Sequence, residues 1–77
     1  MLTREDELKQ IGLNISYFRK ARGYSQMALA EKAGISRAYL STIEAPNLST
    51  SMSLDVLLDI AKALDIPAEK LLHFNEL

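Results

Sequence analysis

The chain begins with a helical pattern of hydrophobic positions. Its apolar residues recur at three- and four-residue steps, the spacing of one face of an α-helix, at Leu8, Ile11, Ile15 and Phe18. Thr3 is a suitable N-cap with Asp6 three residues later, and Gly23 is a suitable residue to end this helix. Gly12 interrupts the pattern and weakens the helix by roughly 1 kcal/mol relative to alanine. It indicates either close packing or the true start of the fold, with residues 1–9 as an extension.

Residues 25–44 (SQMALAEKAGISRAYLSTIE) predict two short helices joined by a tight turn. Ser25 and Ser36 are good N-caps for the two helices. Gly34 lies between them, where the chain needs a positive φ that glycine adopts at low cost. Pro46 prevents the second helix from continuing. The pattern is that of a helix-turn-helix.

The second of these helices has two distinct faces. Leu40 and Ile43 are three residues apart and predict the buried face. The opposite face carries short side chains apart from one arginine, and polar ones apart from one alanine. Its residues are Arg37, Ala38, Ser41 and Thr42. Such a face suits entry into the major groove of DNA.

The C-terminal part predicts two further helices. Ser53 caps the first, with Ile60 at the edge of a buried face that consists of Leu54, Leu57, Leu58, Ala61 and Leu64. Pro67 suits the first position of a last short helix, residues 67–72. Two alternatives remain for the apolar residues at the end, a dimer interface or the edge of the core; they are Leu71, Leu72 and Phe74. We therefore expect an all-α fold of five helices.

Composition narrows the class of protein. The chain has 77 residues, 48% of them hydrophobic and 25% charged, which is typical of one globular domain. It has no cysteine, so disulfides and thiolate zinc sites are excluded. The N-terminus is too charged for a signal peptide and no apolar run approaches 18 residues. We expect a cytoplasmic protein without membrane contact.

Charge is distributed unevenly. The net charge is −1, which by itself does not favour nucleic acid. Residues 9–37, however, contain six cations and one anion, whereas residues 45–77 contain two cations and five anions. This asymmetry fits a DNA-facing side and an acidic back, although ordinary surface charge is the alternative.

The combined motifs resemble the Cro/CI-type repressor family, also called the XRE family. The matching positions are Ser25-Gln26, Leu29-Ala30, Ala33-Gly34-Ile35-Ser36, Leu40-Ser41 and Ile43-Glu44, with Ile15, Phe18-Arg19 and Arg22-Gly23 upstream and the run from Leu54 to Leu64 downstream. The resemblance covers about residues 10–72. It implies a lambda-repressor-like DNA-binding domain over residues 1–77 that binds double-stranded DNA as a homodimer.

The resemblance also implies roles for individual residues. The positions of base-reading side chains fall on Arg37, Ala38, Ser41 and Thr42, with Arg37 suited to guanine or, alternatively, to a phosphate. Residues that could contact phosphate are Gln26, Ser36, Tyr39, Asn47 and Ser49. In the family a glutamine at the position of Gln26 also supports the recognition helix; Gln26 could instead be simply solvated, and Tyr39 could instead cover the core. The loop 45–52 lacks the lysine or arginine that the family often places there, which predicts weaker and less salt-dependent binding.

Arg19 has two interpretations. It could contact a phosphate, but in the family an arginine at this position pairs with the glutamate that ends the recognition helix. The resemblance therefore implies an internal ion pair between Arg19 and Glu44.

The sequence bears on three classes of function. A sequence-specific DNA-binding regulator, expected to be a repressor, explains most of these features. The alternative is a protein-interaction module on a helix-turn-helix scaffold that binds a partner in the manner of an antitoxin. An enzyme has no support, because the sequence carries no catalytic constellation or phosphate-binding glycine loop. We expect no cofactor and no metal, since His73 is the only histidine.

Overall fold

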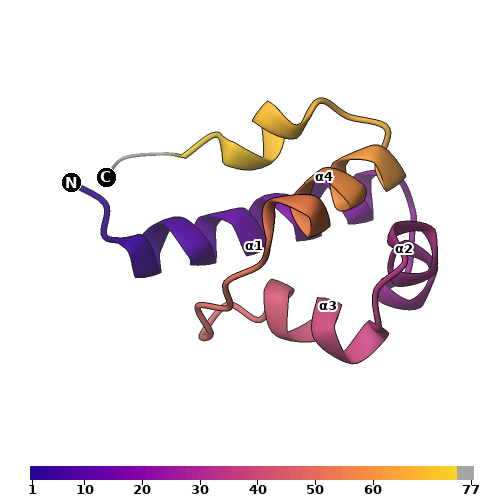
Figure 1. Cartoon of the computed structure of the whole chain (residues 1–77), viewed down its shortest axis with the longest axis horizontal. Helices are drawn as coiled ribbons and strands as arrows, with labels where there is room; N and C mark the ends of the chain where they lie inside the picture. Colours follow the sequence, from indigo (N-terminus) through magenta and orange to yellow (C-terminus); the bar gives the residue numbers. More distant parts are fainter. Residues whose placement is uncertain (75–77) are drawn as a thin grey trace.

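The computed structural model describes residues 1–74 as a short helical bundle (Figure 1). Its elements are α1 (Arg4–Ala21), α2 (Gln26–Ala33), α3 (Arg37–Glu44), α4 (Leu54–Ala63) and the 3-10 helix η1 (Ala68–Leu72). The all-α class is confirmed, but the last element differs from the prediction. It is a 3-10 turn rather than a fifth α-helix, and Pro67 precedes it as the N-cap instead of opening it. Five residues between a proline and an extended segment leave little length for α-helical hydrogen bonds.

Side-chain caps set the start of every α-helix. The hydroxyl groups of the four predicted N-caps each accept a hydrogen bond from the backbone N–H three residues later, and they belong to Thr3, Ser25, Ser36 and Ser53. Asp6 returns a bond to the backbone N–H of Thr3 and completes the predicted capping box. Gly23 and Gly34 have φ values of 75° and 73° and end α1 and α2, as predicted.

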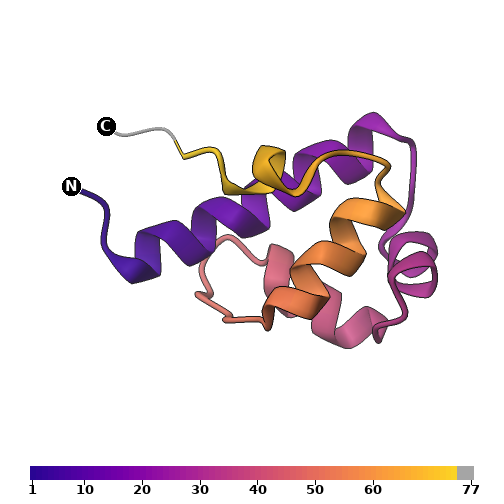
Figure 2. The same ribbon diagram turned by 45° about the horizontal axis from the view of Figure 1, so that its top comes forward.

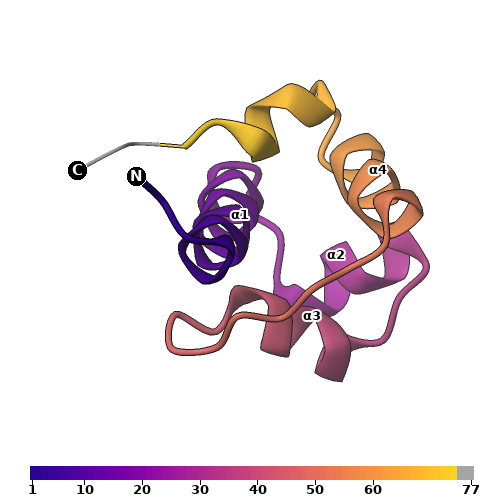
Figure 3. The same ribbon diagram turned by 60° about the vertical axis from the view of Figure 1, so that its left-hand side comes forward.

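The helices surround a small core. Figure 3 looks nearly along α1, with η1 above it, α3 below it and α4 on the far side of the core. α1 packs on α3 and η1, and α2 packs on α3 and α4. The largest fully buried side chains come from every element, namely Ile15, Leu29, Leu40, Ile60, Leu64 and Leu71. The core therefore depends on all five elements.

The buried face of α4 is rotated from the predicted one. Leu54 and Leu58 are 66% and 45% exposed, whereas Ile60, expected at the edge, is fully buried. Apolar residues occupy more than half of the circumference of α4, so their spacing alone left the orientation ambiguous. The packing of α4 against α2 and η1 selects the face that carries Ile60.

α1 is continuous through Gly12, so residues 4–9 are the first turns of α1 rather than a separate arm. Gly12 marks close packing, because a Cβ atom there would overlap the carbonyl oxygen of Ile43 in α3. On its other side, α1 holds the end of η1 and the residue that follows η1. The side-chain amide of Asn14 donates to the carbonyl oxygens of Leu71 at 3.0 Å and His73 at 2.9 Å.

The three apolar residues near the C-terminal end divide between the two predicted alternatives. Leu71 is fully buried, Phe74 packs partly buried against the core, and Leu72 is 45% exposed. Of these three residues, Leu72 alone is therefore exposed enough to contact a partner.

Candidate nucleic-acid interface

α3 presents a polar face to solvent. Arg37, Ala38 and Thr42 are exposed and Ser41 is half-buried, while Leu40 and Ile43 fix the opposite face in the core. The structure thus brings the four predicted base-reading side chains to one side of a single short helix. Within residues 1–74, the Arg37 side chain has no hydrogen bond or ion pair, so its five N–H donors remain available.

Thr42 is already engaged locally. Its hydroxyl donates to the carbonyl oxygen of Tyr39 at 2.7 Å, and its own carbonyl oxygen accepts from the Thr50 hydroxyl at 3.1 Å. The hydroxyl proton of Thr42 is therefore committed to the helix, and its oxygen and methyl group are what it offers outward.

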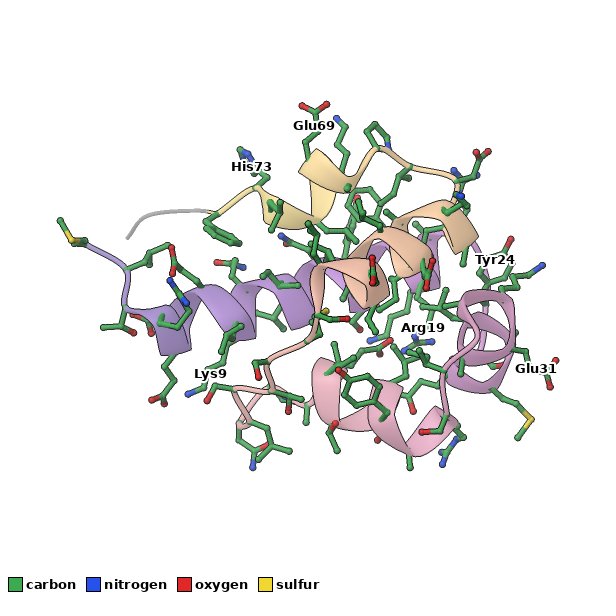
Figure 4. The ribbon with its side chains drawn as sticks, in the orientation of Figure 1. Lys9, Arg19, Tyr24, Glu31, Glu69 and His73 are labelled. Atoms are coloured by element: carbon green, nitrogen blue, oxygen red, sulfur yellow. The ribbon has the colours of Figure 1, made fainter. Side chains whose placement is uncertain are left out.

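A bidentate ion pair joins α1 to the end of α3. The Arg19 Nε and Nη2 atoms donate to Glu44 at 2.8 Å and 2.9 Å, and Nη1 donates to the carbonyl oxygen of Tyr24 at 2.8 Å. The side chains of Arg19 and Glu44 are only 12% and 4% exposed, and Figure 4 shows Arg19 in the space between α1 and α3. Arg19 is therefore used internally and braces α3.

Gln26 joins the same cluster, which agrees with the support of the recognition helix that the family resemblance implies for a glutamine at this position. Its Nε2 atom donates to Glu44 Oε1 at 3.2 Å. Gln26 is half-buried and is the first residue of α2, where backbone N–H groups lack partners inside the helix. The contact leaves a second amide hydrogen for another acceptor.

The other predicted phosphate contacts lie around α3. The Ser36 hydroxyl accepts from the backbone N–H of Tyr39 at 3.0 Å, which leaves its proton available to a ligand. Tyr39 packs partly against the core and its hydroxyl donates to the carbonyl oxygen of Ser51 at 3.4 Å. Asn47 and Ser49 are exposed in the loop after α3. These side chains surround the exposed face of α3, but they are not hydrogen-bonded to one another in the described part of the chain.

Residues 1–74 offer neither a metal site nor a membrane-spanning helix. The described part of the chain contains no group of three histidine, cysteine, aspartate or glutamate side chains that could hold a metal ion. In the same part, no helix has both the length and the apolar character needed to cross a bilayer.

Comparison with known proteins identifies the family. Residues 15–71 match the family model HTH_3, described as helix-turn-helix. The chain belongs to this family of Cro/CI-type DNA-binding transcriptional regulators, which is non-enzymatic. The matched residues include α2, α3 and most of α1.

Two curated relatives are transcriptional regulators named SinR. The protein from Bacillus licheniformis is 44% identical over 63 residues, which are 82% of this chain and 56% of the relative. The protein from Bacillus subtilis is 45% identical over 62 residues, covering 80% of this chain and 55% of the relative. The chain spans about half the length of the curated relatives that it matches.

Solved structures share the fold. The biofilm master regulator SinR in complex with DNA aligns with a TM-score of 0.75 and 44% identity over 82% of this chain and 98% of that one. The restriction-modification controller protein C.AhdI from Aeromonas hydrophila aligns with a TM-score of 0.77 and 34% identity, over 83% and 94% of the two chains. The chain thus shares its fold with a SinR structure and with a controller-protein structure.

Proposed function

We propose that the protein is a repressor that binds a palindromic operator as a homodimer, with α3 in the major groove. The observation that carries the proposal is an exposed α3 face held rigidly from behind. Arg37 and its neighbours face solvent, while the buried Arg19–Glu44 ion pair fixes the far end of the same helix to α1. A recognition helix gains accuracy when its scaffold does not move.

Base reading is assigned to Arg37, Ala38, Ser41 and Thr42. Arg37 has free donors that suit the O6 and N7 atoms of guanine, and Ala38 offers a methyl group to thymine. Ser41 and Thr42 supply hydroxyl oxygens at the edge of the same face. These four side chains, one arginine and three small ones, lie on two turns of helix. This number suits the few base edges that one half-site presents.

Phosphate contacts are assigned to groups around this face. Gln26 and Ser36 lie at the N-termini of α2 and α3, where backbone N–H groups favour anions. Tyr39 lies in the first turn of α3, and Asn47 and Ser49 lie in the loop that follows the other end of α3. All of these groups are uncharged, so we expect a shallow dependence of affinity on salt.

Dimerisation is assigned to the outer side of α4 and the turn that follows it. Leu54 and Leu58 are exposed there, and a hollow of about 550 Å³ lies between α4 and η1. Its lining combines apolar side chains, among them Leu58, Ile66 and Pro67, with the charged Lys62 and Asp65. Exposed leucines beside a partly apolar hollow are typical of an interface. A two-fold dimer would place two copies of α3 on successive turns of DNA.

A second candidate function is binding of a protein partner. One similar structure is a SinR–SinI protein complex. The matched chain is 45% identical to this one, and the match covers 80% of this chain and 59% of the matched chain. The acidic C-terminal half and its exposed leucines could serve such a partner equally well. A cytoplasmic location is proposed for either role.

Selection of bound sites from a random double-stranded library, at moderate salt, tests the proposal. We expect recovery of an inverted repeat whose half-site centres are about one helical turn apart. Recovery of no sequence by folded, concentrated protein would contradict the proposal and favour the partner-binding role.

A further inference from the structure

The loop between α3 and α4 carries no charge. Residues 45–53 (APNLSTSMS) contain neither a basic nor an acidic side chain. All three ribbon views place this loop alongside the N-terminal half of α1 (Figure 1, Figure 2 and Figure 3). A positively charged side chain that contacts the DNA backbone near this loop would therefore have to come from another element.

One side of α1 leads directly to this loop. Gly12 packs against Ile43 and Arg19 binds Glu44, so this side of α1 faces the end of α3. Lys9 is three residues before Gly12, on nearly the same side and about 4.5 Å, or just under one turn, further toward the N-terminus. Because Gly12 already meets the end of α3, Lys9 lies beside the residues that follow α3. Figure 4 shows Lys9 reaching from α1 toward the loop after α3.

Lys9 is held in a readily exchangeable pair. Its Nζ atom lies 3.2 Å from Glu5 Oε1, one turn away on α1, and the two side chains are 34% and 65% exposed. An exposed pair of this kind contributes little to stability. A phosphate oxygen can therefore replace the Glu5 carboxylate as the partner of Lys9 at small cost.

We propose that Lys9 contacts a DNA phosphate beside the α3–α4 loop, leaving Glu5 when DNA binds. The inference rests on the proposed DNA-binding function and deepens it. Lys9 lies outside residues 15–71, the part that matches the family. The first turns of α1 thus supply the charge that the loop lacks.

The test measures affinity against salt concentration on the selected operator and on an unrelated duplex. Lys9→Gln should flatten the slope of log K against log salt by about 0.9 for each bound subunit. Near 0.1 M salt the same slope corresponds to binding about fivefold to tenfold weaker per half-site. The loss should be equal on both duplexes, because a phosphate contact carries no sequence information. Lys9→Arg should restore the slope.

Lys70→Gln is the matched control, since it removes the same charge from η1, on the opposite side of α1 from α3 (Figure 1). It should leave the salt slope unchanged. Glu5→Gln should tighten binding, because Lys9 then has no partner to leave.

Two results would overturn the inference. One is a Lys9→Gln protein with wild-type thermal unfolding and a wild-type salt slope. The other is an equal change of slope in Lys70→Gln, which would reveal a general charge effect. Failure of the proposed function itself looks different, because the wild-type protein would then bind neither duplex.

Discussion

Gly12 of α1 lies directly against the carbonyl oxygen of Ile43 in α3, with no room between them for a Cβ atom. This contact brings the backbones of the two helices together about two turns of α1 from the point where Arg19 binds Glu44. Backbone packing and a buried ion pair therefore fix the end of α3 jointly. The glycine that weakens α1 as an isolated helix allows α1 to support α3.

Substitution of Gly12 tests this packing. Gly12→Ala should lower the free energy of unfolding by about 2 kcal/mol, because the overlap involves backbone that cannot rotate away. The loss should appear even though alanine favours an isolated helix by roughly 1 kcal/mol. Urea unfolding measures it, with Ser16→Ala in the same helix as a control that should change little. An unchanged or raised stability of Gly12→Ala would contradict the close approach.

Removal of the buried carboxylate tests the brace. Glu44→Ala should lower stability by about 3 kcal/mol, because it leaves the Arg19 guanidinium buried without a counterion. The exposed Glu31 in α2 provides a control, for which Glu31→Ala should cost no more than about 0.5 kcal/mol. The relative affinities of Glu44→Ala for different operators should stay as in the wild type. Unchanged thermal unfolding would rule out the bracing role.

Truncation of Arg37 separates its two possible roles on DNA. Arg37→Ala should cost roughly 1–3 kcal/mol at one base pair of each half-site and relax the preference there. Competition between the selected operator and its single-base variants measures this. A loss of equal size on all sequences would instead assign Arg37 to a phosphate.

A charge on the outer side of α4 tests the proposed dimer. Leu58→Glu should yield monomers in analytical ultracentrifugation, because it places a carboxylate in an apolar interface. Leu58 is 45% exposed, so the fold should tolerate the change. Leu13→Glu is a matched control on α1, where Leu13 is 48% exposed. A Leu58→Glu protein that remains dimeric would locate the interface elsewhere.

The starts of the helices could be predicted from the sequence because they depend on local chemistry. Thr3 and Ser53 act on backbone groups three residues away, so their capping roles follow from sequence alone. The orientation of α4 could not be predicted in the same way. Leu58 and Ile60 are both apolar, and only packing against distant elements decides that Ile60 is buried and Leu58 exposed.

The candidate site also has features that could be predicted from the sequence and features that could not. The α3 face with Arg37 followed from helical spacing, and the Arg19–Glu44 pair from the family resemblance. The hydrogen bond from Gln26 to Glu44 spans 18 positions in the chain. The Gly12 contact likewise depends on how closely two helices approach. Neither distance is encoded in the spacing of residues along one element.

The three donors of Arg19 connect α1 to the end of α3 and to Tyr24 in the turn between α1 and α2. A genetic screen for lost operator binding should consequently return substitutions in α1 that never touch DNA. Their hallmark would be temperature sensitivity with unaltered operator choice. Second-site suppressors should then arise among core positions that raise overall stability, and not on the α3 face.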